Sequence, residues 1–349
     1  MTIHLNLKGN DMTTPRLTLK TALAGAALAL ATALPFSASA ADVEIKLAHP
    51  NVPDHPMGQG FEYFKQLVEE RSGGDIEVTI FDSSKFGNFD SVVQGLQSGL
   101  LQMGSASTPN LAPFSKDFLI FDMPFLIPSY EAADLITDGE IGQQAAKALE
   151  PTGILGMGYI EIGFRHNFNS TRSVETLADM EGMKIRSTPS KAHIATLQSL
   201  GANPTPIAWS EVYTALQQQT VDGIDIDLNL AWANNFHEVT ENLTLVGSLY
   251  SPHLVMGSQI WWMGLSPEHQ DLIETAFAEM QVFQRTKIRE NEAEILENMR
   301  EVGMTVVDLT PEERAKFQDA SQTVISEFES EIGAELIEKA RATIADAGL

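Results

Sequence analysis

Strand and helix patterns alternate along almost the whole chain, and this order restricts the possible folds more than any other feature of the sequence. Apolar and polar residues alternate in residues 43–47 and 76–80, which predicts β-strands, and apolar residues recur at helical spacing between them. The cycle continues with a helix expected at 89–98, a strand at 101–105 and a helix at 131–149. Alternation of this kind favours an α/β fold with mostly parallel strands.

A second set of strands and helices begins near Arg165 and ends in one very long helical pattern. Ser266 is the expected N-cap, Pro267 occupies the first turn, and no further Gly or Pro occurs before Gly303. At 1.5 Å per residue such a helix would be about 50 Å long. A helix of this length can brace two lobes, and a chain of this size exceeds one ordinary hydrophobic core.

Residues 1–40 have the pattern of a secretory signal peptide. Arg16 and Lys20 precede an apolar run at 22–34, and small residues at Ala38 and Ala40 predict cleavage after Ala40. A retained membrane anchor is the alternative, but the run is shorter than a membrane-spanning helix and Pro35 follows it. Translation starts at Met1 or at Met12, and both give the same exported chain.

The chain is strongly acidic, with a formal net charge of -25 at pH 7. Nucleic acid and anionic membrane surfaces would repel it, so neither is expected as a partner. The absence of Cys excludes disulfides and thiolate metal sites.

Motifs of known enzymes are missing from the sequence. No Gly-rich loop with a following Lys and no nucleophile elbow occurs. His49 and His55 flank a loop with Asp54, but their spacing matches no known zinc motif. We therefore expect a binding protein rather than an enzyme, with no cofactor and no metal.

Two arginines are the first candidates for ligand binding. Arg186 lies at the end of an expected strand, where open α/β sheets place their ligand sites, and Arg165 lies just past another strand end. A guanidinium can hold a carboxylate through two parallel charge-assisted hydrogen bonds. The alternative for both is an ordinary surface ion pair.

Two acids and one tryptophan complete the candidate set. Asp225 and Asp227 share one face of the strand expected at 221–228, where they could accept hydrogen bonds from ligand hydroxyls or pair with an ammonium group. Helix capping or a salt bridge is the alternative for these acids. Trp209 could form an apolar wall against a ligand or belong to the core.

One long motif carries a resemblance to a known family. Residues 201–218 read GANPTPIAWSEVYTALQQ, and VDG at 221–223 and FHEV at 236–239 follow. Shorter matching segments are SGLLQM at 98–103, FDMPFL at 121–126 and GMKIR at 182–186. In this order they resemble the C4-dicarboxylate-type binding proteins of tripartite ATP-independent periplasmic (TRAP) transporters, over essentially the whole mature chain.

The resemblance implies a two-lobed periplasmic binding protein, or Venus flytrap, with the long helix bridging the lobes. Lobe I would comprise residues 41–163 plus 252–290, and lobe II residues 164–251 plus 291–349. The ligand carboxylate would pair with Arg186, with help from Arg165 and Trp209, while Ser107, Asn110 and His49 contribute from the other lobe. The implied protein is a periplasmic monomer that delivers a small carboxylate to TRAP membrane subunits.

The chain departs from the family pattern at one point. Where many relatives read DGQENP, residues 222–227 read DGIDID, so Ile226 replaces the usual amide opposite the arginine. The added acid favours a sugar acid first and a zwitterion second over a plain dicarboxylate. The sequence is also compatible with three alternative functions: a periplasmic enzyme with Asp225 or His49 as base, a metal receptor at His49, His55 and Asp54, and a ligand sensor.

Overall fold

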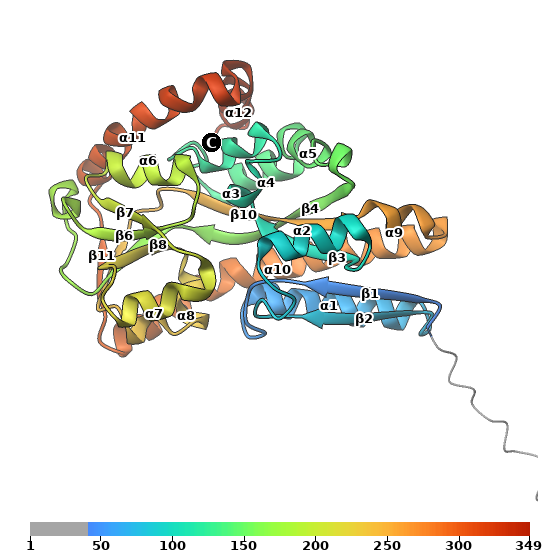
Figure 1. The fold of residues 1–349 in the computed structure, drawn as a ribbon. Helices are drawn as coiled ribbons and strands as arrows, with labels where there is room; N and C mark the ends of the chain where they lie inside the picture. The colour runs from blue at the N-terminus through green and yellow to red at the C-terminus, as the bar shows by residue number, and fades with distance from the viewer. Residues whose placement is uncertain (1–40) are drawn as a thin grey trace, which may run out of the picture. The chain divides into compact units, whose positions relative to one another are not determined.

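A computed structural model describes residues 41–349, so the predicted signal peptide, residues 1–40, lies outside the described residues. The first of two sheets has five strands in the order β2-β1-β3-β10-β4 (Figure 1). The strands are β1 (Val43–Ala48), β2 (Ile76–Phe81), β3 (Met103–Ser107), β4 (Ile154–Phe164) and β10 (Tyr250–Ser258).

The second sheet has six strands in the order β11-β9-β5-β8-β6-β7. They are β5 (His166–Asn169), β6 (Lys184–Ser187), β7 (Asn203–Pro206), β8 (Gly223–Ile226), β9 (Asn242–Leu245) and β11 (Thr305–Asp308). The sequence pattern missed β5, β7, β9 and β11, although it found β6 and β8, which are equally short. Four residues hold at most two periods of a strand, so such a strand is easily missed.

Both sheets are mixed, so the expectation of mostly parallel strands is wrong in part. β10 runs antiparallel to β3 and β4, and β5 runs antiparallel to β8 and β9. The reason is that the chain passes from the first sheet to the second between β4 and β5 and returns between β9 and β10. The strands on the two crossings therefore run in opposite directions. The two crossings are joined by backbone hydrogen bonds from Arg165 N to Leu249 O and from Ser248 N to Arg165 O.

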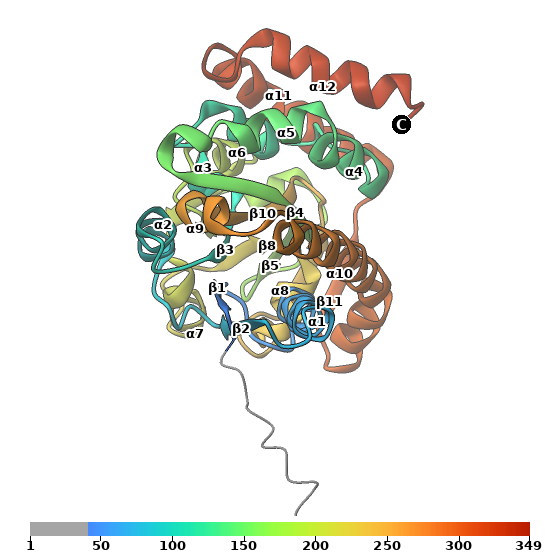
Figure 2. The same ribbon diagram turned by 90° about the vertical axis from the view of Figure 1, so that its right-hand side faces the viewer.

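The predicted long helix is α10 (Pro267–Glu301), and its start signals act as expected. The side chain of Ser266 caps the helix by accepting a hydrogen bond from the His269 amide. α10 packs against α1 (Pro56–Arg71) and β4 on the side of the first sheet and against α8 (Leu228–Ala233) and β11 on the side of the second (Figure 2). The α/β two-lobed fold with a lobe-bridging helix is therefore confirmed.

Two expected helices are broken at glycines. Residues 131–149 form α4 (Tyr130–Asp138) and α5 (Glu140–Lys147), and the C-terminal helix divides at Gly333 into α11 (Pro311–Ile332) and α12 (Ala334–Asp346). Both ribbon views show α11 and α12 on the same side as α4, α5 and α6. α11 packs on α6 and α12 on α4.

The residue boundaries of the two lobes stay a prediction.

The remaining helices are short and connect or cover the strands. They are α2 (Phe89–Ser98), α3 (Thr108–Leu111), α6 (Lys191–Ser199), α7 (Val212–Gln217) and α9 (Gln259–Gly264). Within residues 41–349, none of the helices combines the length and the apolar character that crossing a bilayer requires.

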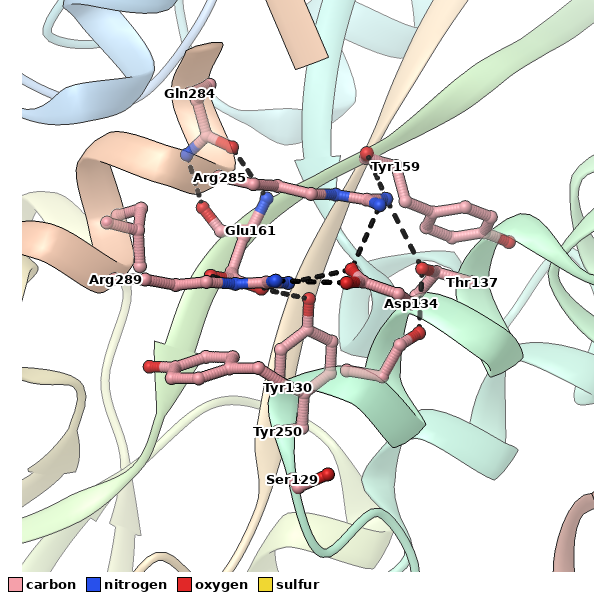
Figure 3. A network of polar contacts seen from close by, with 12 residues as sticks. Ser129, Tyr130, Asp134, Thr137, Tyr159, Glu161, Tyr250, Gln284, Arg285 and Arg289 are labelled. Carbon is pink, nitrogen blue, oxygen red and sulfur yellow. Dashed lines mark hydrogen bonds and ion pairs between the residues drawn. The ribbon is translucent and has the colours of Figure 1, made fainter. Parts of the chain in front are cut away.

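An ionic network around the buried Glu161 side chain fastens α10 to the first sheet (Figure 3). The guanidinium of Arg289 lies between two carboxylates, at 2.9 Å from Glu161 of β4 and 2.7 Å from Asp134 of α4. Arg285, one turn earlier, pairs with Asp134 at 3.0 Å and with Asp138 at 2.5 Å. The Glu161 side chain is fully buried, so its charge depends on Arg289 and on the Tyr250 hydroxyl, which donates to it.

Candidate ligand-binding site

A cleft of about 530 Å³ lies between the two sheets, and residues of both sheets line it. The first sheet contributes the loop after β1, the end of β3 with the start of α3, and the first half of β10. The second contributes β6, the loop after β7 and the junction of β8 with α8. The cleft therefore has the position that a ligand closed between two lobes would occupy.

Arg186 lines the cleft and is buried, with 4% of its surface exposed. Its Nε and Nη2 atoms donate to the Ile207 carbonyl at 3.1 and 2.9 Å, and the guanidinium lies 6.0 Å from the centre of the Trp209 ring. Burial and the nearby Arg165 charge lower the pKa of Arg186 to about 9. No carboxylate among residues 41–349 forms an ion pair with it.

Arg165 also lines the cleft, but its charge is compensated by the protein. Its Nε atom donates to Asp225 Oδ2 at 3.1 Å, Nη2 donates to the Asp225 carbonyl, and Nη1 donates to Ser251 Oγ at 3.3 Å. Burial would raise the pKa of Asp225, but the Arg165 charge and a hydrogen bond from His193 outweigh it and hold the pKa below its usual value. Asp225 is therefore ionised and neutralises Arg165 at pH 7.

His193 of α6 contacts the same Asp225 oxygen, Oδ2, as Arg165 does. The Thr188 amide donates to His193 Nδ1 at 3.2 Å, so the ring proton resides on Nε2, which donates to Asp225 Oδ2 at 2.9 Å. Burial and the Arg165 charge lower the pKa of His193 to about 4, so the ring is neutral. No local sequence pattern predicts this contact, because His193 and Asp225 come together only in the folded chain.

The two predicted acids do not line the cleft. Asp225 lies behind Arg165, and Asp227 is the N-cap of α8, where its Oδ1 atom accepts from the Leu230 amide at 2.8 Å. β8 ends at Ile226, so Asp227 is no longer part of the strand whose alternation placed it beside Asp225. Burial raises the pKa of Asp227 to about 7. The side chain that reaches the cleft here is Ile226.

The other predicted site residues lie together in the cleft. Trp209 lines it next to Arg186, and Ser107, Asn110 and His49 line it from the first sheet. The Asn110 amide donates to Ser107 Oγ at 3.1 Å. Their direct contact with a ligand stays a prediction.

The polar lining residues that were missed include Thr188, Ser251 and His253. Thr188 follows the strand that carries Arg186, and this position was a usable signal. Ser251 and His253 lie on β10, and His253 is paired with Ser107 of β3 in the strand register. A pairing between residues so distant in the sequence leaves no local pattern.

The suggested metal site does not form in the described part of the chain. His55 caps α1 through Nδ1, which accepts from the Met57 amide at 3.0 Å, and Asp54 is exposed. Within residues 41–349, no three His, Cys, Asp or Glu side chains are arranged to hold a metal ion.

Known proteins with related sequences are solute-binding proteins. Residues 47–331 match the family model DctP, described as bacterial extracellular solute-binding protein, family 7. The 2,3-diketo-L-gulonate-binding periplasmic protein YiaO of Escherichia coli is 34% identical, over 74% of this chain and 78% of its own. The C4-dicarboxylate-binding periplasmic protein DctP of Rhodobacter capsulatus is 32% identical, over 93% and 98%.

A solved structure gives the same result for the fold. The sugar acid-binding protein DctPAm of Advenella mimigardefordensis, in complex with galactonate, superimposes with a TM-score of 0.84 at 30% identity, covering 87% of this chain and 98% of its own. The predicted periplasmic location is confirmed, because the family is extracellular and its named relatives are periplasmic. The prediction that the chain is no enzyme also agrees with a family of solute receptors. The chain belongs to the DctP family of bacterial extracellular solute-binding proteins, family 7, whose members include the TRAP receptors it was predicted to resemble.

Proposed function

We propose that this chain is the receptor of a TRAP transporter and binds a small hydroxylated carboxylate, such as a sugar acid, through Arg186. The observation that carries the proposal is a buried guanidinium that lines the cleft and has no carboxylate partner among the described residues. A buried charge without a partner is unfavourable, and a ligand carboxylate would compensate it through charge-assisted hydrogen bonds.

The rest of the lining favours hydroxyl groups on the ligand. Arg165 is already neutralised by Asp225, so the cleft offers one uncompensated cation. Apart from Asp90 at the rim, the other polar lining groups are neutral and can hydrogen-bond hydroxyls; they include Ser107, Asn110, Thr188, Ser210 and Ser251. Two of the three relatives described above are named for a sugar acid or its keto derivative, which supports the same class.

Two alternatives receive less support from the lining. A zwitterion needs an anionic partner, but the one acid among the described lining residues is Asp90, which is exposed at the rim. A C4-dicarboxylate, for which one relative is named, would place its second carboxylate among neutral groups. An enzyme with Asp225 as base is not favoured either, because Arg165 and His193 already engage that carboxylate.

Ligand binding would close the two lobes, since only the closed state offers contacts from both sheets at once. We propose that the closed, monomeric receptor then docks on the TRAP membrane subunits. Arg165 would assist Arg186, with Asp225 fixing its orientation.

Calorimetry on refolded, ligand-free protein lacking residues 1–40 tests the proposal with galactonate, erythronate, succinate and a neutral sugar. We expect the two hydroxylated acids to bind and Arg186→Gln to weaken that binding by about 100-fold, the effect of truncating one partner of a buried charge pair. Arg172→Gln, at an exposed arginine outside the cleft, is the matched control. Tight binding of the neutral sugar alone, or unchanged binding by Arg186→Gln, would refute the proposal.

A further inference from the structure

Two buried histidines face the cleft from the first sheet. His49 follows β1 and is 2% exposed, and His253 lies in β10 and is 7% exposed, yet both line the cleft. The histidine predicted from the sequence was His49 alone, and His253 has no role in anchoring the ligand carboxylate proposed above.

The ring nitrogens of this pair are not engaged by the protein. Both His49 nitrogens and Nδ1 of His253 are buried and have no hydrogen-bond partner in the described chain. The neighbours of His49 do not supply one: Phe61 packs its ring 5.2 Å away, and His55 uses its Nδ1 atom on the α1 cap. Buried polar atoms are usually hydrogen-bonded, so unpaired ones at a cleft indicate a ligand position.

Both imidazoles are neutral at pH 7. Burial lowers the pKa of His49 to about 4, with Asp82 acting against this shift and Lys85 adding to it. Burial lowers the pKa of His253 to about 3, and repulsion from a protonated His49 and from the Arg165 charge acts in the same direction. A neutral imidazole offers one N–H donor and one nitrogen acceptor, which together match a hydroxyl group.

The pair and the carboxylate anchor lie on opposite sheets. Arg186 of β6 lines the cleft from the second sheet, whereas His49, after β1, and His253 of β10 line it from the first. The cation that would hold the carboxylate and the two imidazoles therefore belong to different walls of the cleft.

We infer that His49 and His253 form a second subsite that hydrogen-bonds a ligand hydroxyl remote from the carboxylate held by Arg186. The inference rests on the proposed function and identifies what selects the hydroxylated acids. A second carboxylate at this position would find no compensating positive charge on the two neutral imidazoles. Burial opposes their protonation, so dicarboxylates are disfavoured.

Calorimetry with galactonate and a set of analogues, each lacking one hydroxyl, tests the subsite. We expect at least one analogue to bind the wild-type protein about tenfold more weakly than galactonate does. Loss of the hydroxyl that the imidazoles contact would leave their buried nitrogens unpaired. In His253→Phe and His49→Phe, galactonate itself should weaken by about the same factor, and that analogue should no longer differ from galactonate. His269→Phe, in the first turn of α10 and outside the cleft, is the matched control and should bind like the wild type.

The variants separate failure of the subsite from failure of the proposed function. If Arg186→Gln loses binding while both Phe variants bind galactonate and all analogues like the wild type, the subsite is wrong and the carboxylate anchor stands. If Arg186→Gln binds normally, the anchor is wrong, whatever the histidine variants do. His253→Gln, which keeps a donor and an acceptor, guards against misfolding: it should retain most of the galactonate affinity, and a loss equal to that of His253→Phe at unchanged thermal stability would overturn the subsite.

Discussion

Two pairs of arginines in the described residues differ in their partners, although three of the four, Arg165, Arg186 and Arg285, are buried and the Arg289 side chain is only 30% exposed. Arg285 and Arg289 on α10 are surrounded by the carboxylates of Asp134, Asp138 and Glu161, so every charge in that network has an opposite charge within reach (Figure 3). In the cleft, Asp225 compensates Arg165, whereas Arg186 has only the Ile207 carbonyl and the Trp209 ring.

The difference separates a structural role from a binding role. A guanidinium saturated with carboxylates fixes the elements that carry them, here α10, α4 and β4. A guanidinium that is buried and lacks an anionic partner in the protein can bind the anion of a ligand. Burial alone does not distinguish the two, and the count of carboxylate partners does.

Among the substitutions, removing the Arg289 charge should have the largest effect, and the quantity affected should be the free energy of unfolding. Arg289→Gln leaves the fully buried Glu161 side chain without its cation, which we expect to lower the free energy of unfolding by about 3 kcal/mol. Galactonate affinity of the folded fraction should stay near the wild-type value. Denaturant titration and calorimetry measure the two quantities. Lost affinity at unchanged stability would reverse the roles assigned to the two regions.

Acid should weaken the protein, because five histidines are neutral in the folded chain. The folded-state pKa values of His49, His166 and His193 are about 4 and those of His55 and His253 about 3, all below the ordinary 6.5. The unfolded chain therefore binds more protons, and stability present above pH 6.5 is lost as the pH falls toward 4.

Asp122 and Asp227 act in the opposite direction, because burial raises their pKa values to about 7 and their contribution is lost as the pH rises from 4 to 7. The five histidines outnumber these two acids, so we expect a net loss of about 5 kcal/mol between pH 7 and pH 5, at about 1.4 kcal/mol per pKa unit. Denaturant titration of the ligand-free protein at several pH values measures it. A free energy of unfolding that stays constant or increases as the pH falls from 7 to 5 would contradict the neutral state assigned to the buried imidazoles.

Asp225→Asn should sharpen the contrast within the cleft. The change removes the charge that orients and neutralises Arg165, and we expect galactonate affinity to fall about tenfold through misplacement of that guanidinium. Asp227→Asn is the control: Asn also caps helices well, so affinity should remain unchanged. Calorimetry on both variants gives the answer, and equal losses would mean that Asp225 has no special link to Arg165.

The smallest effect is expected for Trp209→Leu. The indole ring is 6.0 Å from the Arg186 guanidinium, and such a contact contributes about 0.5–1 kcal/mol where it is partly exposed. We expect galactonate affinity to fall about threefold, measured by calorimetry, with Trp232→Leu outside the cleft as control. A loss as large as that of Arg186→Gln would make the aromatic wall, not the cation, the main determinant.

The sequence predicted those parts of the molecule that depend on local signals. Ser266 and Pro267 located the start of α10, and the motif around Trp209 identified a family in which Arg186 faces a cleft. Asp227 was misplaced because β8 ends at Ile226, two residues before the end predicted from its alternation. His253 was missed because its position depends on the antiparallel pairing of β10 with β3, which no local pattern encodes.

The most direct test measures two substitutions in parallel, Arg186→Met and Arg289→Met, for ligand-free stability and for galactonate affinity. Removal of an unpaired buried cation should leave the free energy of unfolding unchanged or raised while binding is lost. Removal of the paired cation should lower the free energy of unfolding and leave binding intact. If Arg186→Met is destabilised as strongly as Arg289→Met and still binds galactonate, Arg186 is a structural cation and the proposed binding site is wrong.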